Sequence, residues 1–224
     1  PAFGMKVKNF NKEEIKAMEG IQDAFIVDTT IPEPGWADVN AFNQLIAIVG
    51  NSTWQLMQAK KMLRVNWENV SALESSEMHE QRLIKDLERG EISESRKDGN
   101  PDAAFAKATK VIERTYSSPF MSHNTLEPMN FFADVKENSV ELIGPTQTPK
   151  ALEDSVSKLL EIPAENITVS MTRIGGGFGR RLYVHFGVEA AAISKKMGAP
   201  IKLIYTREDD MTQGTYRPAY RSVY

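Results

Sequence analysis

Cysteine is absent from this chain of 224 residues, and its absence excludes several kinds of site. Without a thiol, the segment forms no disulfide, holds no metal or iron–sulfur cluster through sulfur, and has no cysteine nucleophile. No run of 18 apolar residues occurs, so the sequence predicts no transmembrane helix. The formal net charge is only −3, with both signs mixed along the chain, so no excess of positive charge would attract nucleic acid.

The remaining composition is that of a folded protein with one or two domains. Apolar residues make up 41% and charged residues 25% of the chain, which is typical of globular rather than disordered proteins. The chain opens Pro1-Ala2-Phe3-Gly4, with neither an initiating methionine nor a signal peptide. We therefore interpret it as a fragment of a longer protein. The compartment, bacterial periplasm or cytoplasm, stays open.

The residues before about position 70 are expected to form short strands around one helix. The apolar runs 24–27 and 45–49 and the alternation at 64–68 are typical of strands. Ser52 is expected to cap a helix that continues to Leu63. Polar residues dominate from 71 to 100, where the spacing at 79–89 predicts an amphipathic helix with Leu83, Ile84 and Leu87 on its inner side. We place a domain boundary in this polar connector.

From residue 101 onward the pattern predicts a mixed α+β domain. A short helix is expected at 102–107, and strands are expected at 111–117, 129–135, 140–143, 167–171 and 201–205. Thr148 and Pro149 are expected to cap and start a helix. A further helix is expected to run from Leu182 to Met197 and to stop at Gly198.

Four glycines fall within five positions, Gly175-Gly-Gly-Phe-Gly179, between a predicted strand and a predicted helix. Glycine amides beside a helix start can point several N–H groups at one anion or one polar oxygen. Arg180 and Arg181, expected in the first helical turn, would oppose the helix dipole unless an acid or an anionic ligand offsets them. The spacing fits neither the dinucleotide fingerprint nor the Walker phosphate loop. A tight strand-to-helix connection is the alternative.

Other motifs stand in order along the chain. They are Ser122-His-Asn-Thr-Leu-Glu-Pro-Met-Asn130, Pro145-Thr-Gln-Thr-Pro149, the glycine loop, Tyr205-Thr-Arg-Glu-Asp-Asp-Met211 and Tyr216-Arg-Pro218. In this order and spacing they resemble the molybdenum-binding large subunit of the xanthine dehydrogenase/aldehyde oxidase family, most closely its isoquinoline 1-oxidoreductase β-subunit branch. The opening residues and 45–68 resemble the later part of that family's hammerhead-like α+β domain. The resemblance thus divides the chain into hammerhead-like residues 1–70, a connector at 71–100, and the first part of the molybdenum cofactor-binding domain at 101–224.

The resemblance also implies chemistry and a cofactor. Members hydroxylate aldehydes or N-heteroaromatic compounds with oxygen from water, using molybdenum held by a pterin dithiolene, in bacteria commonly as the cytosine dinucleotide. Electrons leave through a small [2Fe–2S] subunit, and a cytochrome is one candidate acceptor. In that family no protein side chain ligates the metal, so the resemblance implies that this chain supplies no metal ligand.

Residue by residue, the resemblance makes Gln147 the glutamine that donates to an oxygen ligand of molybdenum. Gly175, Gly176, Gly177, Phe178 and Gly179 become the loop that approaches the cofactor, with Phe178 as a wall of the metal site, and Arg180 becomes a candidate for a cofactor phosphate. Leu182 replaces the glutamate of the purine-oxidising branch, so purine recognition is not carried over. The family's catalytic glutamate, in a Gly-x-Gly-Glu motif, is absent from these residues.

The other polar residues have simpler interpretations. His123 is expected to bond the backbone at a strand start, Glu127 to be a buried carboxylate that supports a loop, and His185 to be a helix residue. The acidic run 208–210 is expected to cap a helix. For Arg180 and Arg181 two roles stay open: a solvated surface or local salt bridge, or a cofactor phosphate.

We expect the fragment alone to be inactive, to hold no cofactor, and to self-associate through apolar faces that are normally covered. Two alternatives to the molybdenum enzyme remain. One is a non-catalytic binding or scaffold module of the same fold. The other is a phosphate- or nucleotide-binding protein that uses the loop at 175–181.

Overall fold

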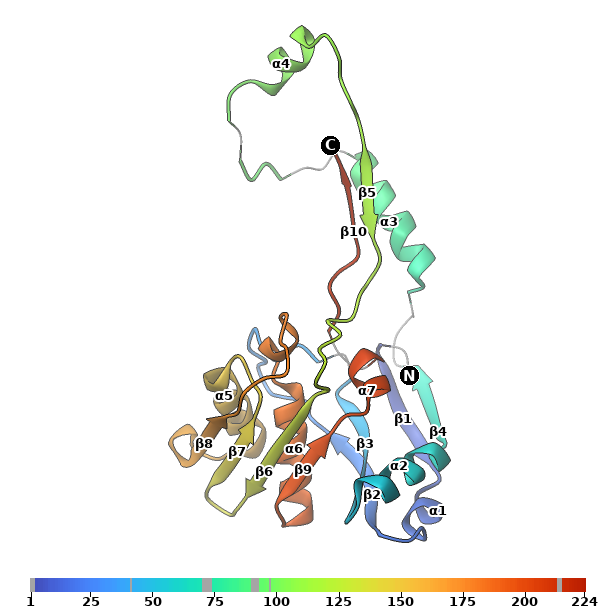
Figure 1. Cartoon of the computed structure of the whole chain (residues 1–224), viewed down its shortest axis with the longest axis vertical. Helices are drawn as coiled ribbons and strands as arrows, with labels where there is room; N and C mark the ends of the chain where they lie inside the picture. Colours follow the sequence, from blue (N-terminus) through green and yellow to red (C-terminus); the bar gives the residue numbers. More distant parts are fainter. Residues whose placement is uncertain (1–2, 41, 70–73, 90–92, 97, 213–214) are drawn as a thin grey trace. The chain divides into compact units, whose positions relative to one another are not determined.

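The computed structural model describes residues 3–40, 42–69, 74–89, 93–96, 98–212 and 215–224. The chain forms two compact units: Pro1–Leu73 with Ser122–Thr215, and Glu74–Met121 with Tyr216–Tyr224. The fold is α+β, as the sequence predicts (Figure 1). The predicted boundary near residue 70 lies outside the described residues. The division into 1–70, 71–100 and 101–224 stays a prediction.

The first stretch of the larger unit pairs its strands in two antiparallel ribbons, β1 with β4 and β2 with β3. Its elements are β1 (Met5–Phe10), α1 (Lys12–Lys16), β2 (Ile21–Asp28), β3 (Gln44–Gly50), α2 (Thr53–Met62) and β4 (Val65–Asn69). Ile15, Ala24 and Ala59 form a small core where α1, β2 and α2 meet. The strands and the helix expected before residue 70 are confirmed, but Ser52, although it stands at the N-cap position of α2, makes no side-chain capping bond, so that expectation is wrong.

The second stretch of this unit is a four-stranded mixed sheet in the order β8-β7-β6-β9. The parallel pair is β7 with β8, and the other two pairs are antiparallel. The elements are β6 (Asn130–Val135), β7 (Val140–Gly144), α5 (Pro149–Leu160), η1 (Ala164–Asn166), β8 (Ile167–Met171), η2 (Arg180–Leu182), α6 (His185–Met197), β9 (Ile201–Ile204) and α7 (Arg207–Thr212).

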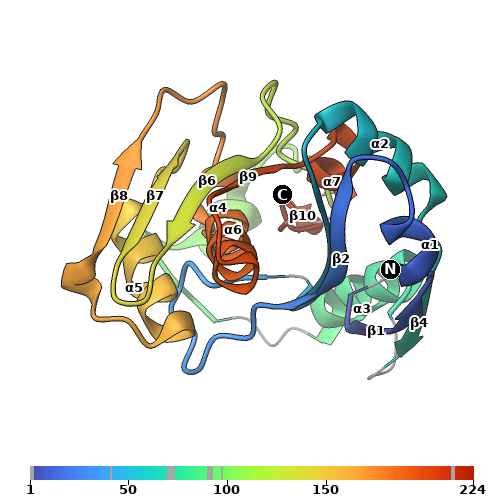
Figure 2. The same ribbon diagram turned by 90° about the horizontal axis from the view of Figure 1, so that it is seen from below.

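The helices α5 and α6 cover the same face of this sheet (Figure 2). Phe131 of β6 and Phe186 of α6 stack at 5.6 Å between ring centroids inside this core, and Leu152 and Val156 of α5 are fully buried beside them. On its other side α6 packs against β2, where Phe25 and Val27 contact Ile193. Helix α6 is therefore buried between the sheet and the β2–β3 ribbon.

The smaller unit contains α3 (Ser76–Arg89), α4 (Pro101–Lys107), β5 (Thr115–Ser118) and β10 (Tyr220–Val223). Strands β5 and β10 pair antiparallel, and Arg221 of β10 forms an ion pair with Glu80 of α3. Asn100 caps α4 by accepting from the N–H of Ala103. None of the residues described in α3 and α4 is buried.

Three further local expectations are wrong. Leu87 of α3 is 45% exposed, because the part of the chain described here packs little against that helix. Strand β5 begins at Thr115, and Val111 and Ile112 before it are exposed rather than in a strand. Thr148 does not cap α5 with its side chain, because its hydroxyl donates instead to the carbonyl of Leu182 at 2.8 Å.

Candidate functional site

The glycine loop connects β8 to η2, as the sequence predicts for a strand–loop–helix junction. Gly176 has φ = 100° and Gly179 has φ = 90°, values that glycine adopts without steric cost. Phe178 between them has φ = 53°, and its side chain is 65% exposed. A bulky residue in the left-handed region is strained, and such strain persists where the surrounding structure enforces it.

All five carbonyl groups of the loop have hydrogen-bond donors, whereas three of its amides have no acceptor among the described residues. Each carbonyl from 175 to 179 accepts a hydrogen bond. In chain order the donors are Glu127 N at 3.2 Å, Arg181 Nε at 2.8 Å, Arg180 N at 2.8 Å, His123 Nδ1 at 2.7 Å and Leu182 N at 3.3 Å. Among the residues that the structure describes, none accepts from the N–H of Gly176, Gly177 or Gly179. The loop is therefore a set of hydrogen-bond donors, which suits an anion or a polar oxygen.

The side chain of Gln147 lies directly against this loop. A Cβ atom placed on Gly177 would come within 2.7 Å of its Oε1 and 3.4 Å of its Nε2. The backbone N–H of Gln147 donates to the carbonyl of Arg181 at 3.0 Å, which ties residue 147 to the end of the loop. Gln147 itself is exposed, so its carboxamide is open to a ligand. The structure thus brings together the predicted site residues Gln147, Gly177 and Phe178.

Glu127 supports the loop as the sequence predicts, and His123 bonds the backbone as predicted, although at the glycine loop and not at a strand start. Glu127 accepts from the N–H of Gly175 at 2.7 Å through Oε2 and from Asn130 at 2.9 Å through Oε1, although its side chain is about one-third exposed rather than fully buried. His123 donates to the carbonyl of Phe178 at 2.7 Å. Both residues are supports, and neither has a geometry that requires a catalytic role.

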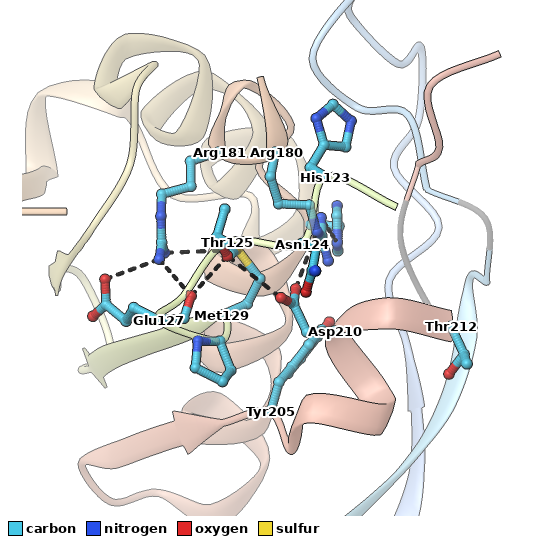
Figure 3. Close-up of polar contacts among 12 residues, drawn as sticks. His123, Asn124, Thr125, Glu127, Met129, Arg180, Arg181, Tyr205, Asp210 and Thr212 are labelled. Carbon is cyan, nitrogen blue, oxygen red and sulfur yellow. Dashed lines mark hydrogen bonds and ion pairs between the residues drawn. The ribbon is translucent and has the colours of Figure 1, made fainter. Parts of the chain in front are cut away.

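The two arginines after the loop do not start the long helix. They lie in the separate turn η2, Tyr183 is extended, and α6 begins only at His185, so the expectation of two arginines in the first turn of that helix is wrong. Their side chains are 1% and 0% exposed, which also excludes a solvated surface. The local salt bridge is confirmed: Arg180 Nε bonds Asp210 at 3.1 Å and Arg181 Nη2 bonds Glu127 at 2.9 Å (Figure 3).

Arg180 also donates from Nη1 to His185 Nε2 at 3.0 Å, inside the protein. Its Nη2 atom is buried, and no described group accepts from it. Its assignment to a cofactor phosphate stays a prediction. Burial and the neighbouring Arg180 charge hold the pKa of His185 well below its ordinary value, so this histidine is neutral. His185 is a helix residue, as predicted.

The sequence reasoning missed Glu189, a buried acid on α6. Its Oε2 accepts from the hydroxyl of Tyr205 at 2.5 Å, while its Oε1 has no described partner. Burial raises the pKa of Glu189 to about 8, and burial beside Glu189 raises the pKa of Tyr205 well above its ordinary value. The signal was a single charge within the otherwise apolar stretch 186–193.

Asp209 and Asp210 of the acidic run 208–210 have different structural roles. Thr206 and Asp209 form a reciprocal cap of α7: the Asp209 carboxylate accepts from the Thr206 N–H at 3.1 Å, and the Asp209 N–H donates to the Thr206 hydroxyl at 3.3 Å. Asp210 is buried and pairs with Arg180 and with Arg207. The expected capping is confirmed for Asp209, and Asp210 belongs to the buried ion pair.

The described residues contain no group of three or more histidine, aspartate or glutamate side chains arranged to hold a metal ion. Within the same ranges, every helix is too short or too polar to span a bilayer.

The chain is similar to known proteins along nearly its whole length. Residues 84–224 match the family described as molybdopterin cofactor-binding domain. The chain is 29% identical over 223 residues to a membrane-bound aldehyde dehydrogenase [pyrroloquinoline-quinone] of Gluconacetobacter polyoxogenes, covering 96% of this chain and 27% of that protein. It is 28% identical over 202 residues to isoquinoline 1-oxidoreductase subunit beta of Brevundimonas diminuta, covering 83% and 25%.

A solved structure, aldehyde oxidoreductase from Desulfovibrio gigas, superposes with a TM-score of 0.70 over 98% of this chain and 27% of its own length, at 13% identity. The fold is therefore shared. These matches confirm the resemblance that the ordered motifs predict. The chain spans about a quarter of the length of the two bacterial relatives named above.

Proposed function

Because the chain belongs to the molybdopterin cofactor-binding domain family, we propose that its glycine loop and Gln147 form part of a molybdopterin site. The parent protein would be the large subunit of a molybdenum hydroxylase that oxidises an aldehyde or an N-heteroaromatic compound. The observation that carries the proposal is the contact between the Gln147 carboxamide and Gly177, where free amide donors and an exposed carboxamide share one place.

The residues of the loop fit such a group. The space beside Gly177 would be lost to a Cβ atom, and three loop amides have no described acceptor. Two apolar side chains, Phe178 at 65% and Leu126 at 89%, are exposed beside Gly176. Exposed apolar groups around polar donors are typical of a surface that a ligand covers.

When bound, molybdopterin supplies two-electron redox chemistry with water as the source of oxygen. The chain's own part is to bind and orient. The N–H groups of Gly176, Gly177 and Gly179 donate to an oxygen or phosphate oxygen, and the Gln147 amide donates to a second oxygen. Phe178 covers the site and excludes water, which strengthens those hydrogen bonds. The catalytic glutamate that the family implies would come from outside these 224 residues.

Further parts of the assembly belong to the same proposal. The cofactor would be the cytosine dinucleotide form, a [2Fe–2S] subunit would receive the electrons, and a cytochrome would be a later acceptor. Self-association of the isolated chain is expected, because several large apolar side chains are exposed, among them Trp36 and Trp54. Each of these statements has its own test in the purified complex.

The proposal is tested by measuring what the purified, co-expressed parent protein contains. Molybdenum is measured by mass spectrometry and the pterin by fluorescence after oxidation, and each is expected at about one per large subunit. Gln147→Ala should lower molybdenum retention, whereas Gln81→Ala, at an exposed glutamine of α3, should not. Pyrroloquinoline quinone in place of pterin, or neither group, would overturn the proposal.

The two alternative functions give different results in the same preparations. A non-catalytic scaffold would contain neither molybdenum nor pterin and would oxidise no substrate of either class. A nucleotide-binding protein would release heat with a free nucleotide in calorimetry, and substitution within the loop would abolish that heat.

A further inference from the structure

One buried side chain contacts each of the three segments that meet at the candidate site. The guanidinium of Arg181 donates from Nε to the carbonyl of Gly176 at 2.8 Å and from Nη1 to the carbonyl of Pro145 at 3.3 Å. Its Nη2 donates both to the carbonyl and to the carboxylate of Glu127, each at 2.9 Å. Figure 3 shows Arg181 reaching toward Glu127 on one side of the cluster while Arg180 reaches toward Asp210 on the other.

These acceptors lie next to the residues of the site. Gly176 directly precedes Gly177, and Pro145 lies two positions before Gln147. The main chain of Arg181 completes the arrangement, because its carbonyl accepts from the N–H of Gln147 at 3.0 Å. One residue is therefore hydrogen-bonded to the main chain at Gln147 and directly before Gly177.

The pattern of acceptors indicates a geometric role rather than a purely electrostatic one. Only one partner of Arg181, Glu127, is charged, and the other oxygen acceptors are main-chain carbonyls. Burial lowers the pKa of Arg181 and the Glu127 charge opposes that effect, so the guanidinium keeps its proton. A planar guanidinium directs several N–H groups along fixed directions, which the single nitrogen of lysine cannot do.

We propose that Arg181 is a positioning residue, which places the Gln147 carboxamide and the amides of the glycine loop so that both serve one bound group. The inference rests on the proposed function, in which that group is molybdopterin. Arg181 itself, fully buried behind the loop, touches no ligand. Arg180 is not equivalent, because its side-chain contacts go to Asp210 and His185 and not to the loop.

The first test uses this chain without any cofactor. In a ¹H–¹⁵N spectrum, Arg181→Met should shift the side-chain amide of Gln147 and the backbone amide of Gly177, while the amides of β1 and β4 stay in place. Arg181→Lys, which keeps the charge, should show smaller shifts of the same two resonances from their wild-type positions. The matched control is Arg64→Met at the exposed Arg64–Glu14 pair, which should leave both resonances unchanged. Unchanged Gln147 and Gly177 resonances in a folded Arg181→Met protein would overturn the inference.

The second test uses the loaded parent protein and a double-mutant cycle. Arg181→Met and Gln147→Ala are each expected to lower molybdopterin retention about tenfold, as the loss of one charge-assisted hydrogen bond would. The double variant should lose less than the product of the two single losses, because part of the effect of Arg181 passes through Gln147. Losses that multiply would show independent roles and overturn the inference.

The two tests separate failure of this inference from failure of the proposed function. Wild-type protein that lacks molybdenum and pterin refutes the function, and the spectral test of Arg181 still stands. If Arg181→Met does not fold, Arg181→Lys and Glu127→Gln are compared instead, because both keep the side-chain volume. Both should shift the Gln147 and Gly177 resonances in the same direction, and shifts confined to residue 127 would contradict the role.

Discussion

The Oε1 atom of Gln147 lies 2.7 Å from the point at which a Cβ of residue 177 would stand. Two residues 30 positions apart are thus in contact only because one of them has no side chain. Glycine at 177 leaves room for the neighbouring carboxamide and is not required by the backbone, whereas the positive φ of Gly176 favours glycine by itself. The two glycines can therefore be separated experimentally.

Gly177→Ala is expected to fold normally and to lose cofactor. The clashing atoms belong to the flexible end of Gln147, which can move away, so the free energy of unfolding should change by no more than about 1 kcal/mol. The displaced carboxamide should then no longer serve the ligand. Urea denaturation and molybdenum content, measured on the same preparation, check both statements.

Gly176→Ala is the matched comparison. Alanine at φ = 100° is strained, so this variant should be less stable by about 1–3 kcal/mol. If Gly177→Ala were instead the more destabilising of the two, the assignment of Gln147 as the reason for Gly177 would be wrong.

Phe178 offers a test of backbone strain at the exposed tip of the loop. Its φ of 53° suits glycine better than any residue with a Cβ. Phe178→Gly and Phe178→Ala both remove the ring, so their difference reports the backbone alone. The glycine variant should be more stable by about 1 kcal/mol, because alanine keeps the left-handed penalty. Equal thermal midpoints, or a higher midpoint for alanine, would show that the loop relaxes and stores no strain.

Glu189 and His185 predict a specific dependence of stability on pH. The pKa of Glu189 is raised from 4.5 to about 8, so between these values the folded state keeps a proton that the unfolded chain releases, and stability falls as pH rises. The pKa of His185 is lowered from 6.5, so below pH 6.5 the unfolded chain binds the extra proton, and stability falls as pH falls. From pH 4.5 to 6.5 the two effects oppose each other.

Above pH 6.5 only the Glu189 effect remains. The free energy of unfolding should therefore decline by up to about 1.4 kcal/mol per pH unit between pH 6.5 and 8. Glu189→Gln, which cannot ionise, should remove this decline and make the protein relatively more stable at pH 8. Urea denaturation of both proteins at four pH values checks the slope. A wild-type curve that is flat over this range, or one that Glu189→Gln leaves unchanged, contradicts the prediction.

The buried pair of Arg180 and Asp210 should matter for stability far more than an exposed pair. Asp210→Asn leaves a guanidinium inside the protein without a counter-charge, which costs about 3–5 kcal/mol. Glu14→Gln, at the exposed partner of Arg64, is the control and should leave the urea midpoint where it is. A similar small effect at both sites would mean that water reaches Arg180 once its partner is neutral.

Much of the fold could be predicted from local pattern. The strand expected at 129–135 is β6, and Gly198 ends α6 with φ = 62°, both as expected. The glycine loop could be placed at its junction because glycine content is itself a local signal. The role proposed for Gln147 rests on the order of motifs and stays a prediction, and the structure adds that its carboxamide lies beside Gly177.

Burial of Arg180 and Arg181 could not be predicted in this way. Whether a guanidinium can enter a core depends on its acceptors, and the two charged acceptors, Asp210 and Glu127, lie 30 and 54 positions away from Arg180 and Arg181 respectively. In sequence, two adjacent arginines after a glycine loop have the same composition whether they are solvated or enclosed. The strand expected from residue 111 begins later for a related reason. Apolar residues predict a buried strand, but Val111 and Ile112 are exposed, and local sequence does not show whether an apolar run is covered.

The packing of α6 against β2 also constrains the order in which the protein can assemble. The amine of Lys196 bonds the carbonyl of Ile26, 170 positions earlier in the chain, beside the contact of Ile193 with Phe25 and Val27. During translation the β2–β3 ribbon leaves the ribosome long before α6 exists, with the apolar side chains of Phe25 and Val27 still uncovered. Closing so long a loop is slow. The β2–β3 ribbon is therefore the stretch that a chaperone would have to shield until α6 has been synthesised.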